Sequence, residues 1–254
     1  MKKMRQAVGF GRGFLAPFGA FGLLLRTPRS WPLSLVPPAL FGLLEVLFVV
    51  FAWHYVRPWV LGAVSSASWV EWLHFELLQR LVPEAASIGA VVVAAWLGWR
   101  VAGPVAVMIS APALERLVGV AEADLRAPER PALGFVTELG CGVRSMLLGV
   151  ALTLPLELAL TLLEVFFPPV APLTTPLKFI LGALGVAWGL FDYPLTLRGM
   201  PARERFAFML KHLSVVLGFG VAFALLFLVP CFGTLMLPVG VVAATQLYWA
   251  IERQ

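Results

Sequence analysis

Residues 213–251 read LSVVLGFGVAFALLFLVPCFGTLMLPVGVVAATQLYWAI and contain no Lys, Arg, Asp or Glu. A single membrane-crossing helix needs only about 20 apolar residues. Near its middle the stretch is interrupted by the sequence VPCFG (229–233), in which Pro and Gly disfavour a continuous helix. The stretch therefore predicts two apolar helices that fold back on each other in a lipid bilayer.

The composition of the whole chain also indicates a membrane protein. Its 254 residues are 60% hydrophobic and only 13% charged, whereas a globular chain carries about 25% charged residues. The net charge of +5 does not indicate nucleic-acid binding, because the cations are not gathered in a compact basic patch with interleaved aromatic residues. They lie between the apolar segments instead.

These segments predict an all-α, polytopic integral membrane protein with a single membrane domain over residues 1–254. The predicted elements are two full transmembrane helices at 34–56 and 85–109, two membrane-embedded helical hairpins at 143–196 and 213–250, and cytoplasmic amphipathic segments at 110–142 and 197–212. Whether the hairpins cross fully or are re-entrant stays open, because Leu213–Val229 would be only about 25 Å long as a helix. We expect Asp192 to cap a new helix from Pro194 onward.

The first 26 residues combine a basic start with an apolar stretch from Phe14 to Leu25, as a signal peptide does. The sequence RTPR (26–29) follows in place of a small-residue cleavage site. We therefore expect a retained amphipathic segment that lies at the membrane face.

The distribution of basic residues predicts the orientation. Of the 19 Lys and Arg residues, 15 fall on the side of the N-terminus, Arg100 lies within a span, and three fall on the opposite side (Arg57, Arg80 and Lys178). Cytoplasmic loops carry an excess of Lys and Arg. We therefore expect both termini to be cytoplasmic, in a multi-pass protein of a bacterial-type inner membrane.

Charged residues at the first hairpin are candidates for lining a polar pathway. Glu157 and Glu164 are seven residues apart and share one face of the predicted helix. A carboxylate near mid-bilayer costs on the order of 3 kcal/mol on insertion scales, so it usually faces a bundle interior or a wet cavity. Both residues could instead lie near the non-cytoplasmic surface or be protonated in place. Glu138 and Arg144 flank the start of this helix and could pair or form a solvated helix start.

Signals for catalysis and metal binding are weak. Cys141 and Cys231 are the only cysteines, and two thiols alone form no metal site. The three histidines belong to different predicted regions (His54, His74 and His212). No nucleophile and base are recognisable as a pair. We expect no enzyme activity, no catalytic residues, no cofactor and no metal.

Several motifs occur mainly after residue 190: FDYP (191–194), LGFG (217–220), LPV (237–239) and AT (244–245), with SAP (110–112) after the second span. In these motifs the chain resembles CysZ-type sulfate permeases and the broader etoposide-induced-2.4-like membrane proteins, over about residues 10–250. The resemblance implies an all-helical inner-membrane protein with two full spans, two membrane hairpins, cytoplasmic termini and a homo-oligomeric assembly.

The resemblance also implies sulfate transport that feeds cysteine synthesis. In these permeases adjacent arginines near the start of the first long helix form a natural oxyanion site. The corresponding stretch here is PRSWP (28–32), which offers Arg29, with Arg26 nearby. The first hypothesis is therefore a passive pathway for sulfate or a similar small anion. Arg26 and Arg29 would bind the anion, and the lipid bilayer would surround the protein. The alternative is a non-transport membrane scaffold or assembly factor.

Overall fold

The computed structural model describes residues 9–67, 76–128, 151, 153–229 and 232–253. In this part of the chain the secondary structure is helical, with short turns and no strand, which confirms the predicted all-α class. The chain divides into two compact units, residues 36–111 and residues 1–35 with 112–254, and each has its own hydrophobic core.

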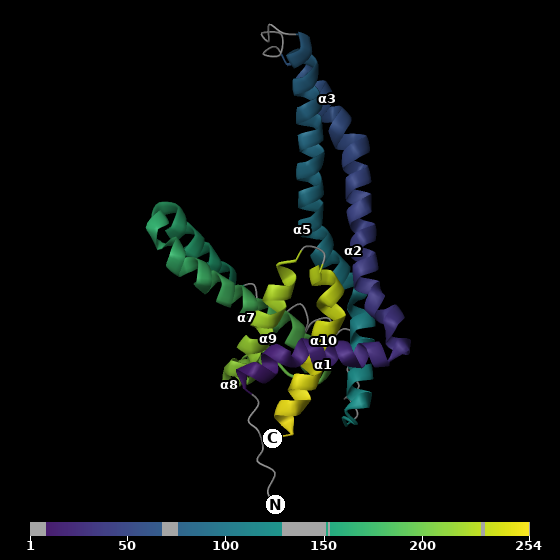
Figure 1. The fold of residues 1–254 in the computed structure, drawn as a ribbon, viewed down its shortest axis with the longest axis vertical. Helices are drawn as coiled ribbons and strands as arrows, with labels where there is room; N and C mark the ends of the chain where they lie inside the picture. The colour runs from purple at the N-terminus through teal and green to yellow at the C-terminus, as the bar shows by residue number, and fades with distance from the viewer. Residues whose placement is uncertain (1–8, 68–75, 129–150, 152, 230–231, 254) are drawn as a thin grey trace, which may run out of the picture. The chain divides into compact units, whose positions relative to one another are not determined.

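The smaller unit is a pair of long apolar helical arms. One arm is α2 (Trp31–Phe51), whose residues from Val36 onward belong to this unit. It continues through the π-helical turn η2 (Ala52–Val56) into α3 (Arg57–Ser65). The other arm is α5 (Glu76–Asp124), whose residues up to Ala111 belong to this unit. The two arms run side by side (Figure 1).

Small residues on α5 let the two arms approach closely. Phe41 packs in a small core with Ala102 and Ala106. A Cβ atom added to Gly98 would lie only 2.8 Å from the Cβ of Phe48, so this position fits glycine alone without a shift of the phenyl ring. The side chain of Phe48 thus packs directly against the backbone of α5 at Gly98.

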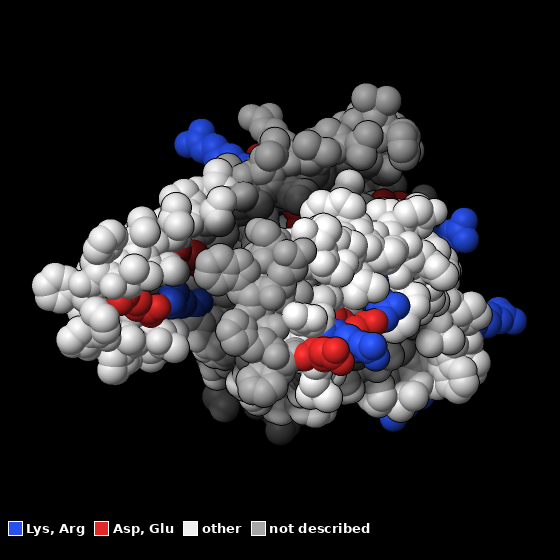
Figure 2. Space-filling model, turned by 90° about the horizontal axis from the view of Figure 1, so that it is seen from above, with Lys and Arg blue, Asp and Glu red and all other residues white. Residues whose placement is uncertain are grey.

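The outside of this pair is covered by large apolar side chains. Exposed residues on the two arms include Leu43, Val46, Leu47, Val50, Val92, Val93, Trp96 and Leu97. Most of the described surface seen in Figure 2 carries neither an acidic nor a basic side chain. Soluble monomers rarely expose contiguous apolar patches larger than a few hundred Å². A bilayer is the solvent in which such a surface is stable.

The larger unit contains the remaining helices. After the turn η3 (Pro168–Val170) come α7 (Ala171–Leu197), α8 (Ala202–Lys211), α9 (Leu213–Phe227) and α10 (Phe232–Glu252). The N-terminal helix α1 (Phe10–Arg26) and the short η1 (Pro28–Ser30) belong to the same unit. Because α7 runs through Pro194 without a break, the expectation that Asp192 caps a new helix is wrong.

Glycines bring the helices of this unit into backbone contact. A Cβ on Gly13 of α1 would lie 2.1 Å from the carbonyl oxygen of Val215 on α9, and one on Gly218 of α9 would lie 2.2 Å from that of Phe10. A Cβ on Gly220 would lie 2.2 Å from the carbonyl oxygen of Ala183 on α7. Helix α1 therefore crosses α9 at backbone distance, and α9 packs on α7 in the same way.

A single hydrophobic core joins these helices. Phe191 of α7 and Phe219 of α9 are fully buried, with ring centroids 5.1 Å apart in an edge-to-face arrangement. The last turns of α5 enter the same core through an apolar stripe that is completely buried, formed by Leu114, Leu117, Val118 and Ala121. Residues of α5 from Pro112 onward thus belong to the core of the larger unit.

Among the described residues, four helical stretches are long and apolar enough to cross a membrane: Pro28–Ser65, Glu76–Asp124, Pro168–Leu197 and Phe232–Glu252. A fifth is possible if α8 and α9, which meet at a bend of 93°, form one span. This count agrees with a polytopic membrane protein. The break expected around 229–233 falls between the end of α9 and the start of α10. Helix α5 extends beyond the predicted 85–109 span at both ends.

Candidate functional site

The first candidate site is the corner between α1 and α2, where the predicted anion-binding residues lie. Thr27 caps the C-terminus of α1, and its N–H donates to the carbonyl oxygen of Leu24 at 3.2 Å. The hydroxyl of Ser30 donates to the carbonyl oxygen of Thr27 at 2.7 Å, and the indole Nε1 of Trp31 donates to that of Leu24 at 3.0 Å. These bonds fix the path of the chain through the corner.

Arg26 and Arg29 project from this corner as two exposed cations. Arg26 is in the last turn of α1, and Arg29 is in η1. Within the described part of the chain, neither guanidinium makes a hydrogen bond or an ion pair. Guanidinium groups bind oxyanions through charge-assisted hydrogen bonds that are about twice as strong as neutral ones. Two unpaired arginines three residues apart on a fixed corner can therefore bind a small oxyanion.

The first hairpin contains the second candidate site. Glu164 pairs with Lys178 of α7 and accepts a hydrogen bond from the hydroxyl of Thr174 at 2.5 Å. These residues flank the turn formed by Phe167 and η3. The charge of Glu164 is thus neutralised next to the turn, where it ties the two arms of the hairpin together.

Glu157 lies two turns before Glu164 and differs from it in having no ionic partner among the described residues. The face that the two acids share is turned toward α7. Glu164 pairs with Lys178 of α7, and the methyl group of Thr153, which lies on the same face, would be 3.9 Å from a Cβ added to Gly185 of α7. Glu157 is half-buried, and Thr161 donates only to its backbone oxygen, at 2.8 Å. Its carboxyl is therefore a polar group within an apolar hairpin.

The remaining predicted pathway residues, Glu138 and Arg144, lie outside the described residues, as do both cysteines. Among the residues described, no three His, Cys, Asp or Glu side chains gather as the ligands of a metal ion would.

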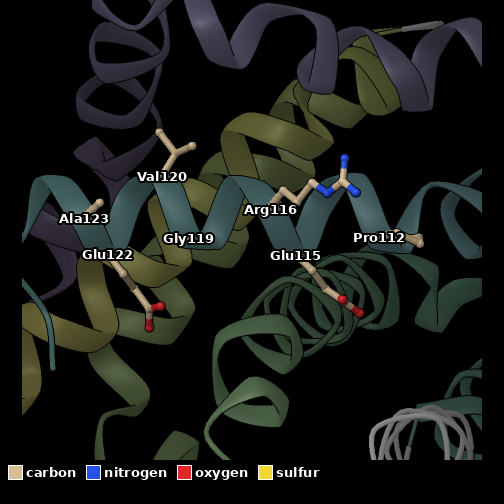
Figure 3. A pocket seen from close by; sticks show the side chains of 7 residues that line it. All are labelled: Pro112, Glu115, Arg116, Gly119, Val120, Glu122 and Ala123. Carbon is tan, nitrogen blue, oxygen red and sulfur yellow. The ribbon is translucent and has the colours of Figure 1, made fainter. Parts of the chain in front are cut away.

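A shallow hollow of about 720 Å³ lies along the C-terminal part of α5. Its lining comes entirely from this helix: Pro112, Glu115, Arg116, Gly119, Val120, Glu122 and Ala123. The carboxylates of Glu115 and Glu122 point to one side of the helix, and Arg116 points to the other (Figure 3). Side chains of both charges on different sides of one helix do not converge on a common ligand.

Sequence reasoning missed two arginine networks on the larger unit. The first centres on Arg205 of α8, whose side chain is only 1% exposed. It pairs with Asp192 and donates to the hydroxyl of Thr196 at 2.6 Å and to the carbonyl oxygen of Met200 at 2.7 Å. Its Nη2 atom is buried and has no partner in the described part of the protein. This network fastens α8 to the end of α7.

The second network joins the ends of α5, α7 and α10. Arg198 donates to Glu122 at 2.8 Å and 3.2 Å, and its guanidinium carbon lies 4.4 Å from the ring centroid of Trp249. Arg253 lies 5.7 Å from the same ring and donates to the carbonyl oxygen of Leu125. Cations over an indole ring gain cation–π attraction. The arginines thus hold three helix ends together.

Comparison with known proteins gives one family. Residues 16–238 match the family described as "Sulfate transporter CysZ/Etoposide-induced protein 2.4". No curated protein matches the chain.

Proposed function

The chain belongs to the family of sulfate transporter CysZ and etoposide-induced protein 2.4, and from this premise we propose that it forms a passive pathway for sulfate or a similar small oxyanion. The proposed substrate class follows from the family description and from the chemistry of the corner between α1 and α2. The protein is a multi-pass membrane protein, so the pathway would cross a bilayer.

The observation that carries the proposal is the pair of unpartnered cations at Arg26 and Arg29. A surface arginine with a carboxylate neighbour is already neutralised, as Arg57 is by Glu84 at 2.8 Å. Arg26 and Arg29 have no such neighbour among the described residues, so their donors are available to an oxyanion. In the proposed orientation both termini are cytoplasmic, and this corner lies at the cytoplasmic face of a bacterial-type inner membrane, where released sulfate would enter cysteine synthesis.

The proposal includes a homo-oligomer and no enzymatic step. Both hairpins and the long arms expose apolar faces that lipid or a second copy would cover. The carboxyl of Glu157, which has no ionic partner among the described residues, would repel an anion unless it is protonated or meets a cation from another copy. Arg26 and Arg29 act by attraction alone, so no bond is formed or broken.

Transport into proteoliposomes tests the proposal directly. We expect purified protein to pass radiolabelled sulfate faster than empty vesicles, without an added energy source. The double substitution Arg26→Gln and Arg29→Gln removes two charge-assisted partners and should lower uptake at low sulfate at least about tenfold. The control is Arg203→Gln, which removes an exposed cation on α8.

Two results would contradict different parts of the proposal. If the natural sequence passes no sulfate, sulfite or similar oxyanion above empty vesicles, the pathway is refuted. If the double variant and Arg203→Gln transport equally well, the pathway stands but the two arginines do not bind the anion.

A membrane scaffold is the second candidate function, and the pairing of Glu164 with Lys178 favours it. This ion pair uses a predicted pathway residue to hold a hairpin together. If the protein is a scaffold, we expect other membrane proteins to copurify with it in mild detergent and reconstituted vesicles to show no anion flux. If only further copies of this chain copurify, the scaffold function is not supported.

A further inference from the structure

A groove runs along the crossing of α1 and α10 in the larger unit. It has a volume of about 200 Å³ and is lined by Arg12, Leu15, Ala16 and Gly19 of α1 and by Gln246, Leu247 and Ala250 of α10. Most of the lining is apolar, and the two strongly polar groups are the guanidinium of Arg12 and the amide of Gln246. This groove is distinct from the corner that contains Arg26 and Arg29.

The two polar groups of the groove have no partner in the described part of the chain. Arg12 is exposed, and its guanidinium makes no hydrogen bond or ion pair with a described residue. The amide of Gln246 is half-buried and likewise makes none, although its Oε1 lies 3.7 Å from where a Cβ of Gly19 would be. A guanidinium and an amide that can both donate, with no carboxylate among the lining residues, suit a ligand that carries a negative charge.

The outward surface of α1 shows what surrounds the groove. The small face of this helix, with Gly13, Pro17 and Ala20, is buried. Large side chains remain exposed: Phe10 44%, Leu15 61%, Phe18 69%, Phe21 46% and Leu25 54%. A helix that combines exposed aromatic residues with terminal arginines is typical of segments that lie in the interface of a bilayer. The groove therefore opens where acyl chains and headgroups meet.

We propose that the α1–α10 groove is a binding site for an anionic phospholipid. The phosphate would accept hydrogen bonds from Arg12 and Gln246, and the first acyl carbons would lie over Leu15, Ala16 and Ala250. The volume suits a phosphate with its glycerol carbons, and the rest of the lipid would extend along the exposed apolar side chains of α1. The basic net charge of the chain, +5, adds a general attraction for anionic lipid.

Lipid retention by the full chain tests this site. The protein is purified in mild detergent, mixed with phosphatidylglycerol or phosphatidylcholine of identical acyl chains, and examined by native mass spectrometry. We expect preferential retention of phosphatidylglycerol. Arg12→Gln should lower that preference about fivefold, as expected for one basic residue at a membrane surface. Arg203→Gln, which removes an exposed cation outside the groove, should leave it unchanged.

A second variant fills the groove without changing its charge. At Gly19 a Cβ would meet only Gln246 at ordinary contact distance, so Gly19→Leu places its side chain in the groove and leaves Arg12 intact. This variant should lose the preference as well. Three results would each overturn the proposal. The natural sequence could retain the two lipids equally, Arg12→Gln and Arg203→Gln could have equal effects, or Gly19→Leu could keep the full preference for phosphatidylglycerol. Retention requires no transport, so the result is independent of the proposed pathway.

Discussion

Arg205 is the buried cation around which the end of α7 and the start of α8 are organised. Its guanidinium is 1% exposed and is bound by one carboxylate, one hydroxyl and one backbone oxygen. Breaking a buried pair by removing one partner is costly, because the other charge is left uncompensated. The sequence pattern alone marks this residue only as one of several cations in a basic amphipathic segment.

We therefore predict that Arg205→Leu destabilises the protein by about 3 kcal/mol, measured as loss of helicity on heating or in denaturant in detergent. Arg203→Leu, two residues earlier and exposed, should change stability by no more than about 0.5 kcal/mol. Combining Arg205→Leu with Asp192→Asn should cost less than the two single changes added together. If the stability effects of the two single changes are strictly additive, the ion pair contributes nothing to the free energy of unfolding.

At the scale of elements, the helix crossings depend on glycine. Gly218 places the backbone of α9 against that of α1, and any side chain there would meet the carbonyl oxygen of Phe10, which cannot rotate away. On this helix face the absence of a side chain is what allows the crossing.

Gly218→Ala is therefore expected to force α1 and α9 apart and to destabilise the protein by about 2 kcal/mol or more. Gly22→Ala is the matched control on α1, because a Cβ there meets nothing within 4 Å. The control should be neutral or slightly stabilising, since Ala favours a helix by up to about 1 kcal/mol over Gly. Thermal unfolding in detergent distinguishes the two, and equal midpoints for both variants would contradict the backbone contact.

At the scale of the whole molecule, we predict that both chain ends face the cytoplasm. The prediction rests on 15 basic residues on one side against three on the other. Fusions at residue 254 with a fluorescent protein should fluoresce, and fusions with alkaline phosphatase should be inactive, because that enzyme folds in the periplasm. Fusions at Ser66, directly after α3, should give the reverse result. Active phosphatase at the C-terminus would refute this topology.

Local sequence signals predicted much of this molecule. The break predicted within 229–233 falls between α9 and α10, and the predicted amphipathic segment at 110–142 has a buried apolar stripe at Leu114, Leu117 and Val118. These features depend on periodicity and on helix-breaking residues, which act over a few positions. The apolar composition was enough to identify the class of the protein, because lipid requires long uncharged helices.

Long-range pairing could not be predicted in this way. The partners Arg198 and Glu122 are 76 residues apart, and no periodic pattern relates them. Pro194 indicates a helix start that Asp192 would cap, whereas α7 continues through this proline and the carboxylate of Asp192 binds Arg205. At the candidate site, the sequence selected Arg26 and Arg29 but could not show that they lack partners among the described residues.

The contact of α1 with α9 and α10 has a consequence for biosynthesis. Helix α1 packs on α9 and α10, which follow it far along the chain, so its glycine face has no partner until those two helices have been synthesised. Until then this segment must be sheltered by membrane lipid or by the insertion machinery. Chains that terminate before Phe232 would lack α10, and quality-control proteases would meet an N-terminal helix that has lost part of its docking surface.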